Sequence, residues 1–427
     1  MPEPVLASAP LPASAALALF ERTRARTDRL VAPLTPEDTM LQSMEDASPA
    51  KWHLAHTTWF FETFVLRPRV ADYVSPDDRF AVLFNSYYVQ AGPRHARDER
   101  GLVSRPGVDA VRDYRSHVED AVAALLDAGR ADGDEIAALV ELGCHHEMQH
   151  QELLVTDLLH GLSHNPLLPV YKASEPLPVT SEIPLTWTRH EGGLVEIGQD
   201  GGGFAFDCEG PRHRHWLEPY EIADRPVTNR DWIAFMDDGG YTTPEHWLME
   251  GHAVATEQGW SHPLYWWRQD GEWWTYTLRG PQLVALDAPV VHVSYFEADA
   301  FARWSDARLP TEEEHEHAFA EVPIAGNFLD ASATRPGADE GQLRPMPGNG
   351  PWGDVWEWTS SSFSAYPGFQ PPVGALGEYN GKFMINQMVL RGGSCATPLA
   401  QMRPSYRTFF HPHQRWQMLG LRLARTP

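Results

Sequence analysis

Histidines on two segments of the chain have the spacing of metal ligands. His146 and His150 stand at positions i and i+4 of a run that reads His-Glu-Met-Gln-His. On a helix, such positions project from one face, so both imidazoles can reach one metal ion. A second segment, which begins at Trp52 and reads Trp-His-Leu-Ala-His, carries His53 and His56, and either can complete the set. Three neutral imidazoles suit zinc, iron, copper or nickel, so the donors alone do not choose the metal.

The same pair matches a zinc-protease pattern by letter. His146-Glu147-x-x-His150 has the form HExxH, in which the glutamate is the general base of a metalloprotease. The second half of the chain argues against a protease, because it carries the motifs of an unrelated kind of domain. We therefore interpret the pair as part of a different metal site.

Four helical segments are predicted to position these histidines. Apolar residues recur at three- and four-residue spacing from Leu17 onward and in 51–66, 108–128 and 134–161. This pattern predicts an up-and-down helical bundle, whose core is a common place for metal sites. The connection over about 67–107 is long, which predicts a lid or a functional loop.

The texture of the sequence changes after about residue 165. Residues 166–184 hold several prolines and few periodic signals, which predicts a linker. Glycine, proline and aromatic residues then become more frequent, and helices are predicted at 228–237 and 295–305 among short β-like pieces. The predicted organisation is a disordered tail over 1–14, a helical bundle over 15–165, the linker over 166–184, and an irregular α+β domain over 185–427.

The composition limits the kinds of partner. The chain has 58 acidic and 34 basic residues, and its formal net charge of −24 would repel nucleic acid and anionic membranes. Its three cysteines form no CxxC pair, which disfavours a disulfide framework or a zinc ribbon and fits a reducing cytoplasm. No stretch approaches the roughly 18 continuous apolar residues of a membrane span, and the N-terminal region lacks the basic start of a signal peptide.

Both halves of the chain resemble known families. A helix-borne His56 followed about ninety residues later by the His146/His150 pair resembles the DinB-like four-helix bundle family, in which three histidines hold a metal. The second half resembles the formylglycine-generating-enzyme fold, a variant of the C-type lectin fold. The matching pieces are Gly193-Leu-Val-Glu-Ile-Gly, Pro226-Val-Thr-Asn, Pro289-Val-Val-His-Val-Ser, Arg308-Leu-Pro-Thr-Glu, Trp352-Gly-Asp-Val-Trp-Glu-Trp, Arg391-Gly-Gly-Ser and Gly420-Leu-Arg-Leu.

The fusion of the two halves resembles the sulfoxide synthases of ergothioneine biosynthesis, the hercynine oxygenases, over about residues 15–425. This resemblance rests also on Trp52-His-Leu-Ala-His-Thr-Thr-Trp-Phe-Phe-Glu, Asn85-Ser-Tyr-Tyr and His146-Glu-Met-Gln-His-Gln-Glu. It implies Fe(II), O₂, a cysteine-type thiol and hercynine (N-α-trimethylhistidine), with a carbon–sulfur bond and a sulfoxide in the product. The expected partners are thus small molecules, and the protein is expected to be a monomer.

The resemblance also implies roles for single residues. His56, His146 and His150 are expected to be the metal ligands, with His53 as the rival of His56. Arg94 and Arg97, in the long connection, are expected to grip the carboxylates of the thiol substrate, because guanidinium groups bind carboxylates bidentately. Two arginines favour γ-glutamylcysteine, which has two carboxylates, over cysteine.

Hercynine itself calls for further contacts. Its quaternary ammonium has no N–H to donate and needs aromatic faces. The candidates are Phe409 and Phe410, with Trp416 behind them and Tyr366 as a further substrate-binding residue. Gln149, next to a predicted ligand, can hydrogen-bond the substrate imidazole, although an exposed helix amide is an equally good interpretation.

Two departures from the related families affect the expected chemistry. The copper-binding cysteine pair of formylglycine-generating enzymes is not present, because only Cys395 lies in that region. In some sulfoxide synthases, a tyrosine of the C-terminal domain delivers a proton near the metal, and Phe363 is expected at that position here. Tyr87 or Tyr88 is therefore predicted to be the proton donor.

Three other functions compete with this one. An ovothiol-type synthase acts on histidine and cysteine, but that family usually has an extra methyltransferase domain for which 427 residues leave no room. A DinB-type transferase would use a zinc-activated thiol without O₂. A non-catalytic protein would combine the bundle with a ligand-binding lectin-like domain.

Overall fold

The computed structural model describes residues 11–173, 177, 180–199, 201–331 and 341–427. They form two compact units. The first unit comprises Met1–His164 together with two later pieces, Gly201–Ala205 and Gln370–Lys382. The second comprises Asn165–Asp200, Phe206–Phe369 and Phe383–Pro427. The predicted tail is described only from residue 11, and the predicted linker lies partly outside the described residues, at 174–176 and 178–179.

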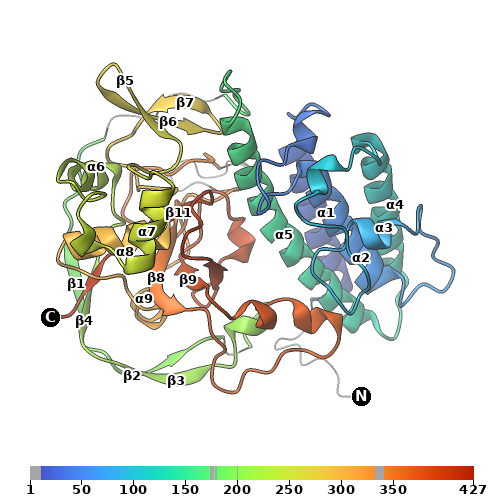
Figure 1. The fold of residues 1–427 in the computed structure, drawn as a ribbon. Coiled ribbons are helices and arrows are strands. Elements are labelled where there is room, and N and C mark those ends of the chain that lie inside the picture. The colour runs from blue at the N-terminus through green and yellow to red at the C-terminus, as the bar shows by residue number, and fades with distance from the viewer. Residues whose placement is uncertain (1–10, 174–176, 178–179, 200, 332–340) are drawn as a thin grey trace. The chain divides into compact units, whose positions relative to one another are not determined.

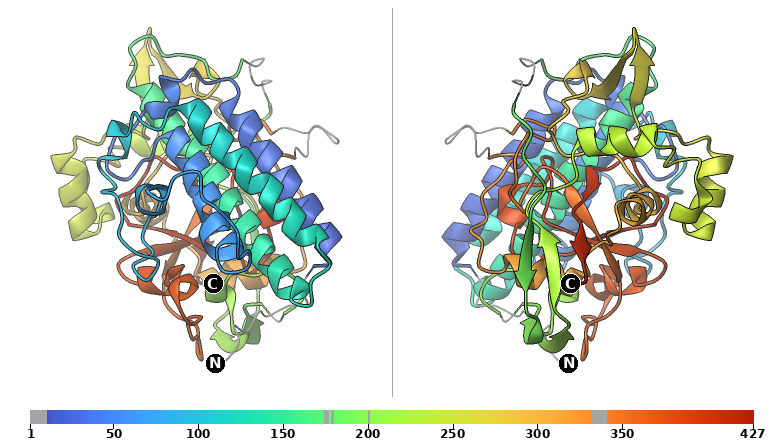
Figure 2. Two further views of the ribbon diagram at one scale, coloured as in Figure 1. Left: turned by 90° about the vertical axis from the view of Figure 1, so that its right-hand side faces the viewer. Right: turned by 90° about the vertical axis from the view of Figure 1, so that its left-hand side faces the viewer.

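Long helices that lie side by side build the first unit (Figures 1 and 2). They are α1 (Ala13–Val31), α2 (Ala50–Phe61), α4 (Val108–Asp127) and α5 (Gly133–Ser163). Helix α1 packs on α5 and α4, and α2 packs on α4 and α5. These elements confirm the predicted helical bundle. A π-helical turn, Glu62–Leu66, continues α2, and a short helix, α3 (Phe80–Leu83), interrupts the long connection.

Apolar periodicity explains how the bundle helices pack. The buried residues of α4 follow three- and four-residue steps, as in Val111, Tyr114, Val118 and Val122. Such a stripe leaves one face of a helix for the core and the other for water. Helix α2 is buried at every position and α5 at most of them, so these two helices form the centre of the bundle. The histidines of interest all stand on these two central helices.

The second unit is an α+β domain with small sheets, which confirms the predicted fold class. Its strands are β1 (Trp187–His190), β2 (Gly193–Ile197), β3 (His213–Leu217), β4 (Tyr220–Ala223), β5 (Trp266–Gln269), β6 (Glu272–Thr277), β7 (Gly280–Leu283), β8 (Trp356–Ser362), β9 (Met388–Arg391), β10 (Thr408–Phe410), β11 (Leu419–Leu421) and β12 (Ala424–Arg425). They form sheets in the orders β1-β4-β12, β10-β9-β8-β11, β2-β3 and β5-β6-β7. Pairing is antiparallel except between β11 and β8, where Leu419 lies opposite Trp356.

The α-helices described in this unit are α6 (Asn229–Asp237), α7 (Met249–Glu257), α8 (Tyr295–Trp304) and α9 (Glu312–Phe319). Of these four, α6, α8 and α9 begin at side-chain caps, and α7 does not. Ser294 caps α8 and Thr311 caps α9, each in a capping box with an acidic residue of the first turn. Helices α6 and α8 lie close to the predicted 228–237 and 295–305, whereas α7 and α9 were not predicted from the sequence.

Buried ion pairs mark the core of the second unit. Glu312 lies 2.8 Å from both Arg391 and Arg407, and Glu357 lies 2.9 Å from Arg422. The Arg407 guanidinium lies 4.1 Å from the Tyr366 ring centroid, and the Arg422 guanidinium lies 5.1 Å from that of Phe319. Each of these two buried carboxylates has a guanidinium partner, as a charge removed from water requires.

Candidate metal centre

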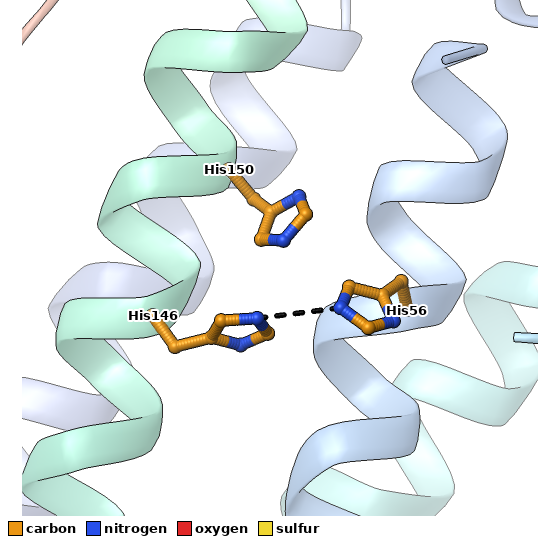
Figure 3. Close-up of side chains that lie close together, drawn as sticks. All are labelled: His56, His146 and His150. Carbon is orange, nitrogen blue, oxygen red and sulfur yellow. Dashed lines mark hydrogen bonds between the residues drawn. The ribbon is translucent and has the colours of Figure 1, made fainter. Parts of the chain in front are cut away.

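Three imidazoles from two helices meet inside the bundle. His56 comes from α2, and His146 and His150 come from neighbouring turns of α5 (Figure 3). One ring nitrogen from each lies within 4.8 Å of the other two. The Nε2 atoms of His56 and His146 are 3.3 Å apart. Metal–nitrogen bonds of about 2.0–2.1 Å place the nitrogens on one ion roughly 3 Å apart, so this spacing suits ligands of a single ion.

The orientation of His56 is set by its surroundings. Its Nδ1 lies 2.6 Å from the carbonyl oxygen of Phe84, so Nδ1 carries the proton and donates a hydrogen bond to that oxygen. Its Nε2 is left as the lone-pair nitrogen that faces His146. The ring is stacked between Trp52 and Trp59, with centroid distances of 4.5 and 5.4 Å. A neutral imidazole with a fixed tautomer is what a metal ligand requires.

His53 has a different environment, although it lies only one turn before His56. Its Nδ1 is 2.8 Å from Nδ1 of His150, and its Nε2 is 3.2 Å from the carboxylate of Asp157. Both ring nitrogens of His53 are therefore engaged with side chains. The structure groups His56, and not His53, with the pair on α5.

Burial keeps these imidazoles uncharged near neutral pH. It lowers the pKa of His146 to about 3, with a smaller contribution from His53. Burial and the nearby histidines also hold the pKa of His56 and His150 well below the usual value. A protonated imidazole cannot bind a metal, so these shifts favour metal binding at pH 7.

The glutamate of the HExxH pattern points away from the histidine cluster. Glu147 is fully buried, and its carboxylate lies 2.9 Å from Arg24 and 3.2 Å from Arg115. It also accepts a hydrogen bond of 2.6 Å from the hydroxyl of Thr27. A carboxylate enclosed by two guanidinium groups cannot serve as the base of a metal-bound water. The structure therefore gives a physical reason against the zinc-protease interpretation.

A tyrosine that the sequence did not reveal lies next to the cluster. The segment 370–382 belongs to the first unit, and the ring of Tyr379 lies 5.6 Å from that of His146. Its hydroxyl donates a hydrogen bond to the side-chain carbonyl of Gln149. Local spacing gave no signal for Tyr379, because it stands in a glycine-containing loop without periodicity.

Polar contacts hold this segment against the long connection. The carboxylate of Glu378 accepts hydrogen bonds of 2.9 Å from the backbone N–H groups of Val89 and Gln90. The ammonium group of Lys382 donates to the carbonyl oxygen of Tyr87 at 2.6 Å and lies 4.9 Å from the Tyr87 ring centroid. These contacts fix the loop that carries Tyr379.

The predicted proton donors, Tyr87 and Tyr88, are part of the same long connection. Tyr87 stacks on Tyr88 at 4.6 Å, and Tyr88 is fully buried. The ring of Tyr88 lies 6.5 Å from that of Phe60, which in turn lies 4.5 Å from the ring of His146. Burial and the neighbouring Tyr87 raise the pKa of Tyr88 well above 10, so its phenol stays protonated. Their role as proton donors stays a prediction.

The predicted carboxylate-binding arginines are on the surface. Arg94 is exposed, and Arg97 donates a hydrogen bond of 2.6 Å to the backbone carbonyl of Asp46. Arg100, which was not singled out, is buried, with its guanidinium 3.5 Å from the Trp52 ring centroid. Burial and the charge of Arg97 lower the pKa of Arg100 to about 9.

The remaining predicted residues belong to the second unit. Phe409 and Phe410 are half-buried on β10; Phe409 stacks on Phe363 at 3.9 Å, and Phe410 lies 6.1 Å from Trp416. Tyr366 is buried, and its hydroxyl donates to Glu312 at 3.2 Å. The hydroxyl of Tyr366 also accepts a hydrogen bond of 2.9 Å from Arg391. A role of these side chains in substrate binding stays a prediction.

Fold and site together define a protein class, in which a helical bundle with a three-histidine candidate metal site is followed by an α+β domain of small sheets. The DinB superfamily model matches residues 19–154. The model of the sulfatase-modifying factor enzyme 1-like domain matches residues 182–339 and 350–427. Among the described residues, no helix is long and apolar enough to cross a membrane.

Relatives that match nearly the whole chain show which family within this class the protein belongs to. The chain is 34% identical to the hercynine oxygenase of Mycolicibacterium thermoresistibile over 94% of its own length and 92% of that protein. It is also 34% identical to the hercynine oxygenase of Mycobacterium tuberculosis, over 94% of its length and 96% of the relative. A formylglycine-generating enzyme of Streptomyces coelicolor matches 48% of the chain at 32% identity and is itself covered over 77%. The chain belongs to the hercynine oxygenase family.

Proposed function

We propose that this protein is an Fe(II)-dependent enzyme that uses O₂ to join a cysteine-type thiol to the imidazole carbon of hercynine and forms the sulfoxide. The observation that carries the proposal is the cluster of His56, His146 and His150 in a chain of this family. The reaction consumes one C–H bond, one S–H bond and O₂, and yields a C–S bond, an S–O bond and water. This balance needs no reductant besides the substrates.

The donor set fits iron. Three neutral nitrogen ligands on one side of an ion leave open positions for substrates, and imidazole is a good ligand for iron as well as for zinc and copper. Bound iron would supply a centre at which the thiol loses its proton and reacts with O₂ beside the imidazole. Holding the reactants together in this way makes their coupling effectively intramolecular.

The surrounding side chains would orient the substrate imidazole and supply a proton. The side-chain carbonyl of Gln149 accepts a hydrogen bond from the hydroxyl of Tyr379. The NH₂ group of Gln149 is therefore the end of the amide that can donate to a substrate imidazole nitrogen. Tyr379 carries a proton at its hydroxyl oxygen close to His146. We propose it as a third candidate for the proton donor, beside Tyr87 and Tyr88.

We propose γ-glutamylcysteine as the preferred thiol. Arg94 and Arg97 lie in one exposed stretch, and the two positive charges suit a dipeptide with two carboxylates. Cysteine has only one carboxylate and would leave one guanidinium without its partner.

Product analysis tests the proposal. Protein loaded with Fe(II) without oxygen is mixed with hercynine, O₂ and either thiol, and the products are read by mass spectrometry. The expected result is the sulfoxide adduct with one O₂ consumed per adduct, more rapidly with γ-glutamylcysteine. Absence of the adduct with both thiols would overturn the proposal. Bound zinc without O₂ uptake would indicate the thiol transferase, and absence of bound metal would indicate a binding protein.

A further inference from the structure

A chain of hydrogen bonds leads away from the histidine cluster. Asp157 lies 3.2 Å from Nε2 of His53, and Nδ1 of His53 lies 2.8 Å from Nδ1 of His150. We propose that Asp157 and His53 are positioning residues that orient His150 and fix which of its nitrogens faces the metal. This inference rests on the metal site of the proposed function and on no property of its substrates.

The geometry gives the chain a direction. The Asp157 carboxylate can only accept, so Nε2 of His53 carries the proton between them. With His53 neutral, its Nδ1 is then the lone-pair nitrogen and accepts a hydrogen bond from the Nδ1–H of His150. Nε2 of His150 is therefore the lone-pair nitrogen, and Figure 3 shows a ring nitrogen of His150 facing the other two imidazoles. The chain thus leaves His150 in the tautomer that a ligand at Nε2 requires.

The positions of these three residues on helices α2 and α5 make this arrangement possible. His150 and Asp157 both stand on α5, two helical turns apart, so their side chains leave the same face. His53 reaches in from α2 and fills the space between them. The chain therefore connects the two central helices at the level of the proposed metal.

The carboxylate at the end of the chain is itself held in place. The backbone N–H of Ser48 donates to the same oxygen of Asp157 at 2.8 Å, and the hydroxyl of Ser48 accepts from Arg100 at 2.9 Å. The side chains of His53 and Asp157 are only 3% and 4% exposed. Water therefore has little access to replace either group if it is removed.

A carboxylate behind a metal-bound histidine usually increases the affinity for the metal. It fixes the ring and makes the ligand nitrogen more basic, and loss of such partners typically weakens metal binding by about 10–100-fold. His53 would transmit this effect from Asp157 to His150. A purely structural pair would instead stabilise the packing of α2 on α5 and leave the metal unaffected.

Metal binding without substrate tests the inference. Dissociation constants for Fe(II) are measured without oxygen, and Co(II) is used as a second probe whose absorption bands report the ligand field. Asp157→Asn and His53→Phe are expected to weaken Fe(II) binding about 10–100-fold and to shift the Co(II) bands, with one ion still bound at saturation. His53→Asn places an amide where Nδ1 stood and is expected to recover part of the affinity lost in His53→Phe.

The control is Glu141→Gln, which neutralises a buried carboxylate on the same helix. It is expected to leave the metal affinity unchanged. Wild-type affinity for Fe(II) and unchanged Co(II) bands in Asp157→Asn would overturn the inference. A lower free energy of unfolding in the same variant would then show that the pair only stabilises the packing of α2 on α5. Asp157→Asn keeps the size of the side chain, so it decides the question even if His53→Phe does not fold. Because no hercynine is used, this outcome is independent of whether the wild-type protein forms the sulfoxide.

Discussion

The hydroxyl of Tyr379 donates a hydrogen bond to the side chain of Gln149, although 230 residues separate them in the sequence. The same tyrosine packs edge-on against His146, so a phenol from a late loop lies beside the candidate metal ligands. Gln149 stands on α5 between His146 and His150, and the contact fixes the orientation of its amide. Proton delivery and substrate orientation can therefore depend on one pair of residues.

Removal of the Tyr379 hydroxyl should slow the reaction without removing the metal. For Tyr379→Phe we expect kcat to fall by about 10²-fold or more, as for loss of a general acid, with Fe(II) stoichiometry unchanged. Steady-state O₂ uptake and metal analysis provide the measurement. Tyr87→Phe and Tyr88→Phe are the comparison. If kcat falls in one of these variants and not in Tyr379→Phe, the sequence-based assignment to Tyr87 or Tyr88 is right.

Each of the three clustered histidines should be needed for tight iron binding. We expect His56→Ala, His146→Ala and His150→Ala to lose stoichiometric Fe(II), because two imidazoles remain where three converge. His53→Ala should still bind one ion at saturating iron. Anaerobic equilibrium dialysis measures the stoichiometry. Retention of iron by His56→Ala together with its loss in His53→Ala would show that the third ligand is misassigned.

The exposed arginines should affect the thiol substrate and not the metal. Arg94→Ala and Arg97→Ala would each remove one charge-assisted contact to a substrate carboxylate. Each substitution is therefore expected to raise KM for γ-glutamylcysteine about tenfold. The effect on cysteine should be smaller, because it has one carboxylate fewer. Arg79→Ala is a matched control, since that exposed arginine pairs locally with Asp77. Equal KM values for the variants and this control would contradict the assignment.

Glu147 should contribute to stability in a pH-dependent way. Burial alone would raise the pKa of its carboxyl, but the charges of Arg24 and Arg115 overcome this effect and hold it at about 2. The unfolded chain then binds more protons than the folded one between about pH 2 and the ordinary glutamate value near 4.5. The stabilisation is complete above that value and is lost as the pH falls, and it amounts to about 3 kcal/mol.

Glu147→Gln leaves both guanidinium groups buried without their anion, so at pH 7 it should lower the free energy of unfolding by about 3–5 kcal/mol. Urea unfolding of both proteins at several pH values measures the difference. This difference should shrink as the pH falls below 4.5, the ordinary value for a glutamate. A constant difference over the range would show that Glu147 is not held as an anion.

Local patterns predicted much of the bundle. The predicted segments 108–128 and 134–161 differ by no more than a few residues from α4 and α5, because apolar stripes on amphipathic helices are encoded by neighbouring residues. The predicted segment 51–66 corresponds to α2 and the π-helical turn that follows it. The shared face of His146 and His150 follows from helix geometry alone.

Other features depend on contacts between distant segments. The sequence contains HExxH by letter, but only the packing of α1 and α4 around α5 directs Glu147 to Arg24 and Arg115. Tyr379 reaches the bundle because Glu378 and Lys382 bind the long connection near residues 87–90. No local spacing predicts such a meeting.

The sequence by itself determined the long helices of the bundle, the histidine pair on one helical face and the family to which the chain belongs. Only the tertiary structure decided that His56 joins this pair while His53 turns to Asp157. The reason is physical: helical periodicity sets the face on which a side chain stands, whereas its partner depends on how α2 packs against α5. That packing is the sum of many contacts between residues far apart in the chain.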